Sequence, residues 1–178
     1  QKGIMAMTGL SFVIGRTAEV EKSKNYPVRS FYCNLYQQYA GFEKNGEMRF
    51  TPPVQTVYAA IQGLKEYYAE GEMPKHERHL RVNRAIHEGV AKLGLKEAIK
   101  PEIQSGLVVS VLYPDDPAWD FGKVHDYCYE RGFTIYPGKI SSSGTFRLCS
   151  LGAIDESDIK DFFVVFTEAF DKLGIRHE

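Results

Sequence analysis

The sequence of 178 residues predicts a protein of the α/β class, and three observations carry this prediction. Two apolar stripes at steps of three and four residues indicate amphipathic helices, one from Val54 to Tyr68 and one from Val82 to Leu93. A run of β-forming residues at 107–113 (LVVSVLY) indicates a buried strand. Residues 145–149 (TFRLC) alternate between apolar and polar side chains, with the period of two that a strand requires.

The first seventy residues are expected to form a short strand followed by helices. Residues 10–14 (LSFVI) are rich in β-formers and lie between glycines, which favours a strand. A helical stretch is expected around 31–39, where apolar residues recur at helical spacing, and a polar loop at 41–48. Thr51 and the two prolines after it mark the start of a helix, because Thr is a good N-cap and Pro is tolerated in the first turn.

The second part of the chain is expected to combine helices with a small sheet. A helix begins near Pro74 and ends at Gly94, and a final helix begins at Asp155 and ends at Gly174. Between them we expect strands at 107–113, 133–136 and 145–149 and a helix at 117–131. In the strand at 145–149, Phe146 and Leu148 are expected to face the core, with Arg147 on the opposite face.

Composition excludes several classes of protein. With 22 Lys and Arg against 23 Asp and Glu, the net charge of -1 argues against nucleic acid as a partner. No apolar run approaches the roughly 20 residues of a membrane span, so no membrane contact is expected. The three cysteines are odd in number and form no CxxC motif, which favours a reducing, cytoplasmic compartment. They are interpreted as small core or half-buried residues.

Arg147 is the first candidate for a binding site. Burying a guanidinium group without a partner is costly, so an arginine within an apolar strand needs an explanation. One alternative is an edge strand or an internal ion pair. The other is a clamp for a carboxylate or phosphonate, because the planar guanidinium can donate two parallel hydrogen bonds.

Thr51 and Arg49 form a second candidate. The start of a helix attracts anions, because its free N–H groups and its dipole converge there. Arg49 stands two residues before Thr51 and would add positive charge. The alternative is that Thr51 only caps the helix, as most Ser and Thr residues at this position do.

No metal site or phosphate loop is predicted. His76 and His79 stand three residues apart on a charged helix, together with Lys75 and Arg78, and this pattern is more typical of a solvated face than of a metal site. The segment 136–139 (YPGK) lacks the glycine spacing and the Ser or Thr of a phosphate-binding loop.

Several segments, in this order along the chain, resemble the class V, fold-type-I aminotransferases that depend on pyridoxal 5'-phosphate. They are residues 1–16, 48–64, 77–86, 132–152 and the final helix. Within this family the sequence is similar to the branch that transfers the amino group of 2-aminoethylphosphonate to pyruvate, and the YPGK segment followed by FR is the most specific part. Met48, where the alanine–glyoxylate branch carries a tyrosine, argues against that branch.

The resemblance implies a fold, a cofactor and site residues. Residues 1–72 would be the end of the large cofactor-binding domain and residues 73–178 a small α+β domain, so the chain would be the C-terminal half of such an enzyme. Lys2 would bond to the cofactor and move a proton during catalysis. Thr51 would bind the cofactor phosphate of the neighbouring subunit in a homodimer with shared active sites, and Arg147 would bind the acid group of the substrates.

Two other interpretations stay open. A related aminotransferase could use alanine or serine with glyoxylate or pyruvate, and Cys149 beside Arg147 leaves the substrate less certain than the chemistry. The second is a non-catalytic α+β interaction domain, since the cofactor-phosphate loop, the ring-stacking residue and the aspartate of the family are absent from this sequence.

Overall fold

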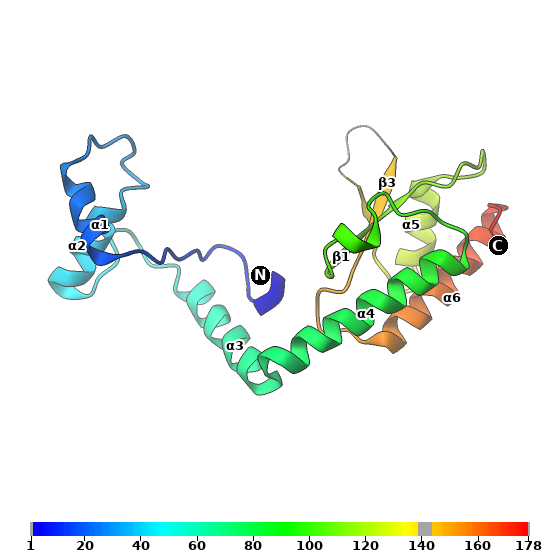
Figure 1. The fold of residues 1–178 in the computed structure, drawn as a ribbon, viewed down its shortest axis with the longest axis horizontal. Coiled ribbons are helices and arrows are strands. Elements are labelled where there is room, and N and C mark those ends of the chain that lie inside the picture. The colour runs from blue at the N-terminus through cyan, green and yellow to red at the C-terminus, as the bar shows by residue number, and fades with distance from the viewer. Residues whose placement is uncertain (1, 139–143, 178) are drawn as a thin grey trace. The chain divides into compact units, whose positions relative to one another are not determined.

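The computed structural model describes residues 2–138 and 144–177 (Figure 1). The chain divides into two compact units, one formed by Ala6–Lys65 and the other by Lys2–Met5 together with the chain from Glu66 onward. The proposed division into two domains at residue 72 stays a prediction. None of the helices in these ranges has the length and apolarity needed to cross a membrane.

The first unit contains α1 (Thr17–Lys22), α2 (Leu35–Asn45) and the first part of α3 (Val54–Glu70). Helix α2 covers much of the predicted loop at 41–48, so that prediction is wrong. The Asn34 side chain accepts from Gln37 N–H at 3.0 Å, and Gly46 ends the helix with a φ of 73°. Local capping therefore extends the helix over a sequence whose polar character indicated a loop.

The strand predicted at 10–14 is wrong. This segment has no regular structure, and the side chains of Phe12 and Ile14 are 74% and 89% exposed. A strand is stable only when a neighbour takes up its backbone hydrogen bonds, and within the described ranges no segment pairs with residues 10–14. The β-forming residues are therefore not sufficient for a strand here.

The second unit packs helices on a small antiparallel sheet. The strands β1 (Val108–Leu112), β2 (Tyr136–Pro137) and β3 (Thr145–Cys149) are arranged in the order β1-β3-β2, with β3 in the centre. Helices α4 (Glu72–Lys92), α5 (Phe121–Tyr129) and α6 (Glu156–Leu173) complete the unit, and α4 runs beside α6 (Figure 1).

Most predicted elements of this unit are confirmed. Residues 145–149 form β3 as predicted, and α6 begins after Asp155 in a capping box and ends at Gly174. Helix α5 is shorter than predicted, because the Asp120 side chain caps it at Lys123 N–H. The strand predicted at 133–136 is wrong except for its last residue, since β2 is Tyr136–Pro137.

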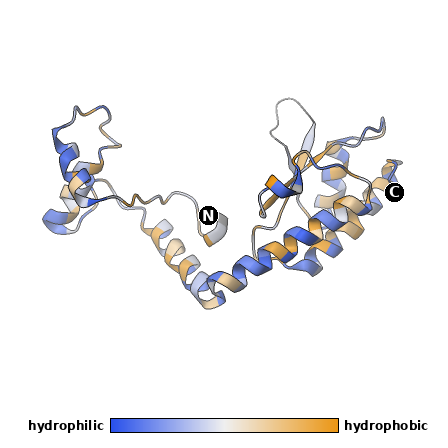
Figure 2. Ribbon diagram, viewed as in Figure 1, coloured by the Kyte–Doolittle hydropathy of each residue, from blue (hydrophilic) through white to orange (hydrophobic). Residues whose placement is uncertain are grey.

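The hydrophobic core lies in this second unit. The apolar and polar residues of α4 and α6 form separate bands along each helix (Figure 2), and the apolar bands pack together. Phe146 of β3 is fully buried and its ring lies 5.6 Å from that of Phe166 in α6. Leu148 is also buried, while Arg147 is half-buried on the other face, as the alternation of β3 predicts.

Candidate active site

Arg147 lies in the central strand of the sheet. Its Nε–H donates to the carbonyl oxygen of Pro137 in β2 at 3.2 Å. No ion pair involving Arg147 is present among the residues that the structure describes. The guanidinium is therefore held by its inner nitrogen, and its two outer nitrogens have no acceptor among the described residues.

The strand β2 can approach Arg147 this closely because residue 138 is a glycine. Gly138 N–H donates to the carbonyl oxygen of Thr145 at 2.6 Å. A Cβ atom at position 138 would overlap the Thr145 hydroxyl and the Thr145 backbone. Only glycine permits the approach, which fixes the Pro137 carbonyl beside the arginine.

Arg49, in the first unit, is held between aromatic rings. Its guanidinium carbon lies 4.5 Å from the ring centre of Phe31 and 5.1 Å from that of Phe50. The backbone N–H of Arg49 donates to the side-chain oxygen of Gln38 at 3.2 Å. The Nη1 atom of Arg49 is buried and has no hydrogen-bond partner within the described ranges. An unpaired buried donor on a cation is suited to an anionic ligand.

Thr51 is exposed and does not cap α3. The helix begins at Val54, and the backbone N–H of Val57 donates to the carbonyl oxygen of Pro53 at 3.0 Å. Thr51 therefore precedes the N-cap position by two residues, and the prediction that it caps this helix is wrong. A proline disfavours helical backbone at the residue before it, so Pro53 keeps Pro52 out of α3 and the helix starts later than the Thr–Pro–Pro pattern indicated.

Lys2 lies in the short 3-10 turn Lys2–Ile4 of the second unit, and its side chain is outside the described part of the structure. Lys139 of the YPGK segment also lies outside the described residues. Arg49 and Thr51 thus share one unit, whereas Arg147 and the backbone of Lys2 belong to the other.

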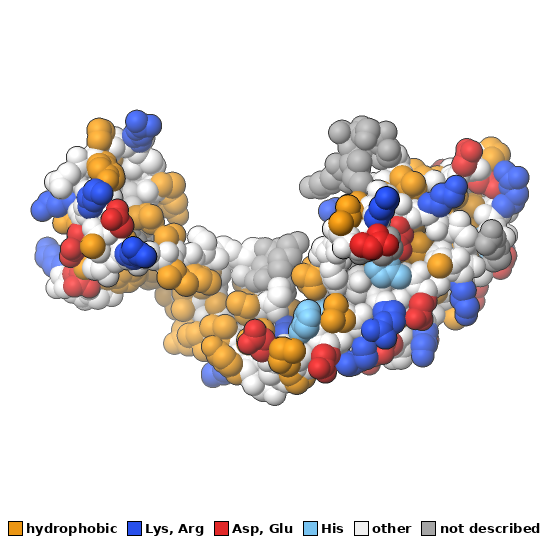
Figure 3. All heavy atoms as spheres, in the orientation of Figure 1, with side chains coloured by type: hydrophobic (Ala, Val, Ile, Leu, Met, Phe, Trp, Pro, Cys, Tyr) orange, Lys and Arg blue, Asp and Glu red, His pale blue; other side chains and the backbone are white. Residues whose placement is uncertain are grey.

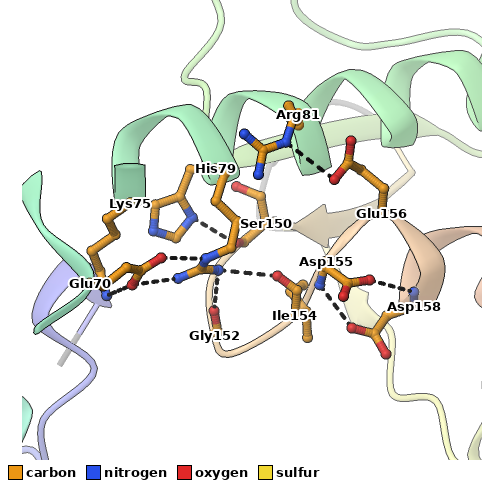
Figure 4. A network of polar contacts seen from close by, with 11 residues as sticks. Glu70, Lys75, His79, Arg81, Ser150, Gly152, Ile154, Asp155, Glu156 and Asp158 are labelled. Atoms are coloured by element: carbon orange, nitrogen blue, oxygen red, sulfur yellow. Dashed lines mark hydrogen bonds and ion pairs between the residues drawn. The ribbon is translucent and has the colours of Figure 1, made fainter. Parts of the chain in front are cut away.

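A polar network that the sequence did not reveal joins the end of α3 to the start of α4 (Figure 4). Glu70 accepts from Arg78 Nε at 2.6 Å and from Lys75 Nζ at 3.2 Å. Arg78 also donates to the carbonyl oxygens of Gly152 and Ile154 at 3.0 and 3.1 Å. The Arg78 hydrogen bond, followed by that of Lys75, lowers the pKa of Glu70 to about 2. The network fixes the loop before α6 to α4.

His79 and Lys75 are buried, at 6% and 3% exposure, so the predicted solvated face is wrong for them. His79 Nδ1 lies 2.8 Å from the carbonyl oxygen of Ser150 (Figure 4). A signal for their burial was present, since 75, 79, 82 and 86 continue the apolar stripe of α4 at steps of four and three.

The remaining candidate groups give no further site. The described residues contain no group of three side chains that could hold a metal ion. Cys128 is buried, which raises the pKa of its thiol to about 11 and keeps it protonated at neutral pH. Cys33 is exposed, so the expectation that all three cysteines are at least half-buried is wrong for this one.

The donors of the first unit fit the phosphate of pyridoxal phosphate. The unpartnered Arg49 Nη1 and the exposed Thr51 hydroxyl, two residues along the chain, are both hydrogen-bond donors. Phosphate oxygens accept strong hydrogen bonds from such groups. The donor set therefore agrees with an anionic phosphate group.

Comparison with curated proteins finds relatives that carry the same name. A scan of family models finds no match. The 2-aminoethylphosphonate–pyruvate transaminase 1 of Burkholderia lata is 34% identical over 176 residues, which are 98% of this chain and 47% of the relative. The transaminase of the same name from Phocaeicola vulgatus is 37% identical over 159 residues, 88% of this chain and 43% of the relative. The chain thus spans about half the length of the curated relatives it matches.

Solved structures show the same fold. Pyridoxamine–pyruvate aminotransferase from Mesorhizobium loti matches with a TM-score of 0.77 and 20% identity, covering 91% of this chain and 42% of that chain. Alanine–glyoxylate aminotransferase from Nostoc sp. matches with a TM-score of 0.73 and 16% identity, covering 87% of this chain and 42% of that chain. The fold predicted for this chain, part of a fold-type-I aminotransferase, is confirmed.

Proposed function

We propose, from the premise that this chain belongs to the class V, fold-type-I aminotransferases, that its protein transfers the amino group of 2-aminoethylphosphonate to pyruvate. The products are phosphonoacetaldehyde and alanine, so the enzyme acts in phosphonate breakdown. The observation that carries this proposal is the 31–37% identity to transaminases of that name over most of this chain. No disulfide joins the three cysteines, all of which lie in the described ranges, and this supports a cytoplasmic location.

Pyridoxal phosphate, when bound, supplies an electron sink that makes the proton on the amino-bearing carbon of the substrate acidic. Lys2 Nζ is the group proposed to hold the cofactor, and it would then take this proton from the substrate carbon and deliver it to the cofactor carbon C4′. Arg49 and Thr51 are proposed to donate hydrogen bonds to the cofactor phosphate. Within the described part of the chain, Arg49 Nη1 lies buried without a hydrogen-bond partner, which supports this role.

Arg147 is proposed to bind the acid groups of the two substrates in turn. The amino donor carries a phosphonate and the acceptor pyruvate carries a carboxylate, and both accept paired hydrogen bonds from a guanidinium. The Pro137 carbonyl accepts from Nε and so restricts rotation of the guanidinium. A fixed acid group orients the reacting carbon, because the rest of the substrate is short.

A homodimer with shared active sites is part of this proposal. An apolar stripe on α3 is exposed in the described chain, and hydrophobic side chains gather over this helix (Figure 3). Its members are Val54, Tyr58, Ile61, Leu64 and Tyr68. An exposed apolar patch of this kind favours coverage by another polypeptide surface, and two-fold dimers are the commonest assembly.

A panel of amino donors tests the proposal. The protein that carries this chain is supplied with pyridoxal phosphate and with 2-aminoethylphosphonate, alanine or serine, and each donor is tested with pyruvate or glyoxylate. We expect the highest kcat/KM for 2-aminoethylphosphonate with pyruvate. Preference for alanine or serine would favour the related aminotransferase, and no turnover with no cofactor binding would favour the non-catalytic interaction domain.

A further inference from the structure

Tyr136 lies beside Arg147 in the sheet. It is the β2 residue directly opposite Arg147 in the antiparallel register, and Ser110 of β1 is the opposite residue on the other side. Directly opposed residues of antiparallel strands project from the same face, with Cβ atoms about 5 Å apart. The three side chains therefore form one row across the sheet, with the arginine in the middle.

The two neighbours of Arg147 differ in reach. A serine hydroxyl is attached to Cβ and stays close to the sheet, whereas a tyrosine hydroxyl stands across the ring and extends about as far as a guanidinium. The Tyr136 side chain is 57% exposed, and no ring contact or hydrogen bond of this side chain is present in the described part of the chain. Of the two neighbours, Tyr136 is therefore the one whose hydroxyl can donate a hydrogen bond to a ligand bound at the outer nitrogens of Arg147.

The number of oxygens on the ligand makes this hydroxyl selective. A carboxylate has two oxygens, and the two outer nitrogens of Arg147 can bind both of them. A phosphonate has a third oxygen, which needs another donor once it leaves water. We infer that Tyr136 donates a hydrogen bond to this third oxygen and so selects a phosphonate over a carboxylate at Arg147. This inference rests on the proposed function of Arg147.

Binding of two small acids tests the inference without any turnover. Methylphosphonate and acetate each carry a single methyl group and differ in the acid group to which it is attached. Their dissociation constants are measured by calorimetry on the protein that carries this chain, for the wild type, Tyr136→Phe and the matched control Ser110→Ala. Tyr136→Phe removes only an oxygen from an exposed side chain, and an unchanged circular dichroism spectrum checks that it folds.

We expect Tyr136→Phe to weaken methylphosphonate binding about tenfold to a hundredfold, the loss of one hydrogen bond to a charged group. Acetate binding should change less than about threefold, and Ser110→Ala should alter neither constant by more than that. An equal change for both acids in Tyr136→Phe, no change for either, or a wild type that binds no methylphosphonate would overturn the inference. A protein that shows this selectivity but does not turn over 2-aminoethylphosphonate would refute the proposed function alone.

Discussion

The guanidinium of Arg147 has one hydrogen bond, from Nε to the Pro137 carbonyl, and no acidic partner in the described ranges. Its role should therefore appear in substrate binding and not in folding. We expect Arg147→Ala to lower kcat/KM about a hundredfold or more and to leave the melting temperature unchanged. Arg147→Lys keeps the charge but loses the paired geometry, so KM for pyruvate should rise strongly.

Steady-state kinetics and thermal melts of the same preparations check this prediction. Arg131→Ala is the matched control, because Arg131 is exposed and its guanidinium lies 3.6 Å from the ring centre of Tyr127, away from the sheet. It should keep wild-type kinetics. If Arg147→Ala unfolds while its remaining folded fraction has normal kinetics, the binding role is wrong.

Thr51 should matter for the cofactor and not for the helix. Since α3 begins at Val54, removing the Thr51 hydroxyl costs no capping hydrogen bond. We expect Thr51→Ala to weaken pyridoxal phosphate binding about tenfold to a hundredfold, as for one hydrogen bond to a charged group. Titration of the apoprotein measures this affinity, and Thr51→Ser should restore it. Wild-type affinity in Thr51→Ala would contradict the role.

At the scale of the elements, the sequence predicted those helices and strands whose own residues supply the capping side chains or the apolar face that packs on the core. Both ends of β3 were predicted correctly, because Phe146 and Leu148 project from one face of the strand and are buried in the core. The strand predicted at 10–14 is wrong because a strand also needs a pairing neighbour elsewhere in the chain, which its own β-forming residues do not indicate. The apolar stripe of α4 did indicate the burial of Lys75, but the charge pattern alone did not indicate its ion pair with Glu70.

The start of α6 offers a direct test of such a local signal. The Asp155 side chain accepts from Ser157 N–H at 2.7 Å, and Asp155 N–H donates to the Asp158 carboxylate at 2.8 Å. We expect Asp155→Ala to lower the melting temperature by roughly 2–5 °C. Asp155→Asn keeps an acceptor oxygen and should lower it less. Equal melting temperatures for all three proteins would show that the cap does not stabilise the fold.

The network between α3 and α4 predicts a dependence of stability on pH. Hydrogen bonds from Arg78 and Lys75 lower the pKa of Glu70 from 4.5 to about 2 on folding, so the unfolded state binds a proton more readily. The stabilisation is complete above about pH 4.5 and is lost as the pH falls toward 2. We expect the free energy of unfolding of the wild type to fall more steeply between pH 5 and pH 3 than that of Glu70→Gln.

Urea titrations at several pH values measure this difference. Exposed Glu88 of α4 provides the control, and Glu88→Gln should follow the wild-type curve. Near neutral pH, Glu70→Gln should already be less stable, because the buried Lys75 loses its charged partner. Parallel curves for the wild type and Glu70→Gln below pH 5 would show that the network does not control acid stability.

At the scale of the whole molecule, the two units differ in how they bury apolar surface. Each buried hydrophobic residue in the described ranges lies at Val82 or beyond, in the second unit. The first unit exposes Phe12, Phe31 and the members of the α3 stripe up to Leu64 instead. The sequence predicted the stripe but could not predict its exposure, because periodicity shows which residues share a face and not what covers that face.

Lys2 is proposed as the lysine that bonds to the cofactor of a transaminase, and reductive trapping of the cofactor tests this assignment. The protein that carries this chain is loaded with pyridoxal phosphate, reduced with borohydride and digested, and the modified peptide is identified by mass. We expect the pyridoxyl group to be attached to Lys2, and we expect Lys2→Ala neither to carry the group nor to form alanine from pyruvate. A pyridoxyl group on another lysine, or transamination at a near-normal rate by Lys2→Ala, would contradict it.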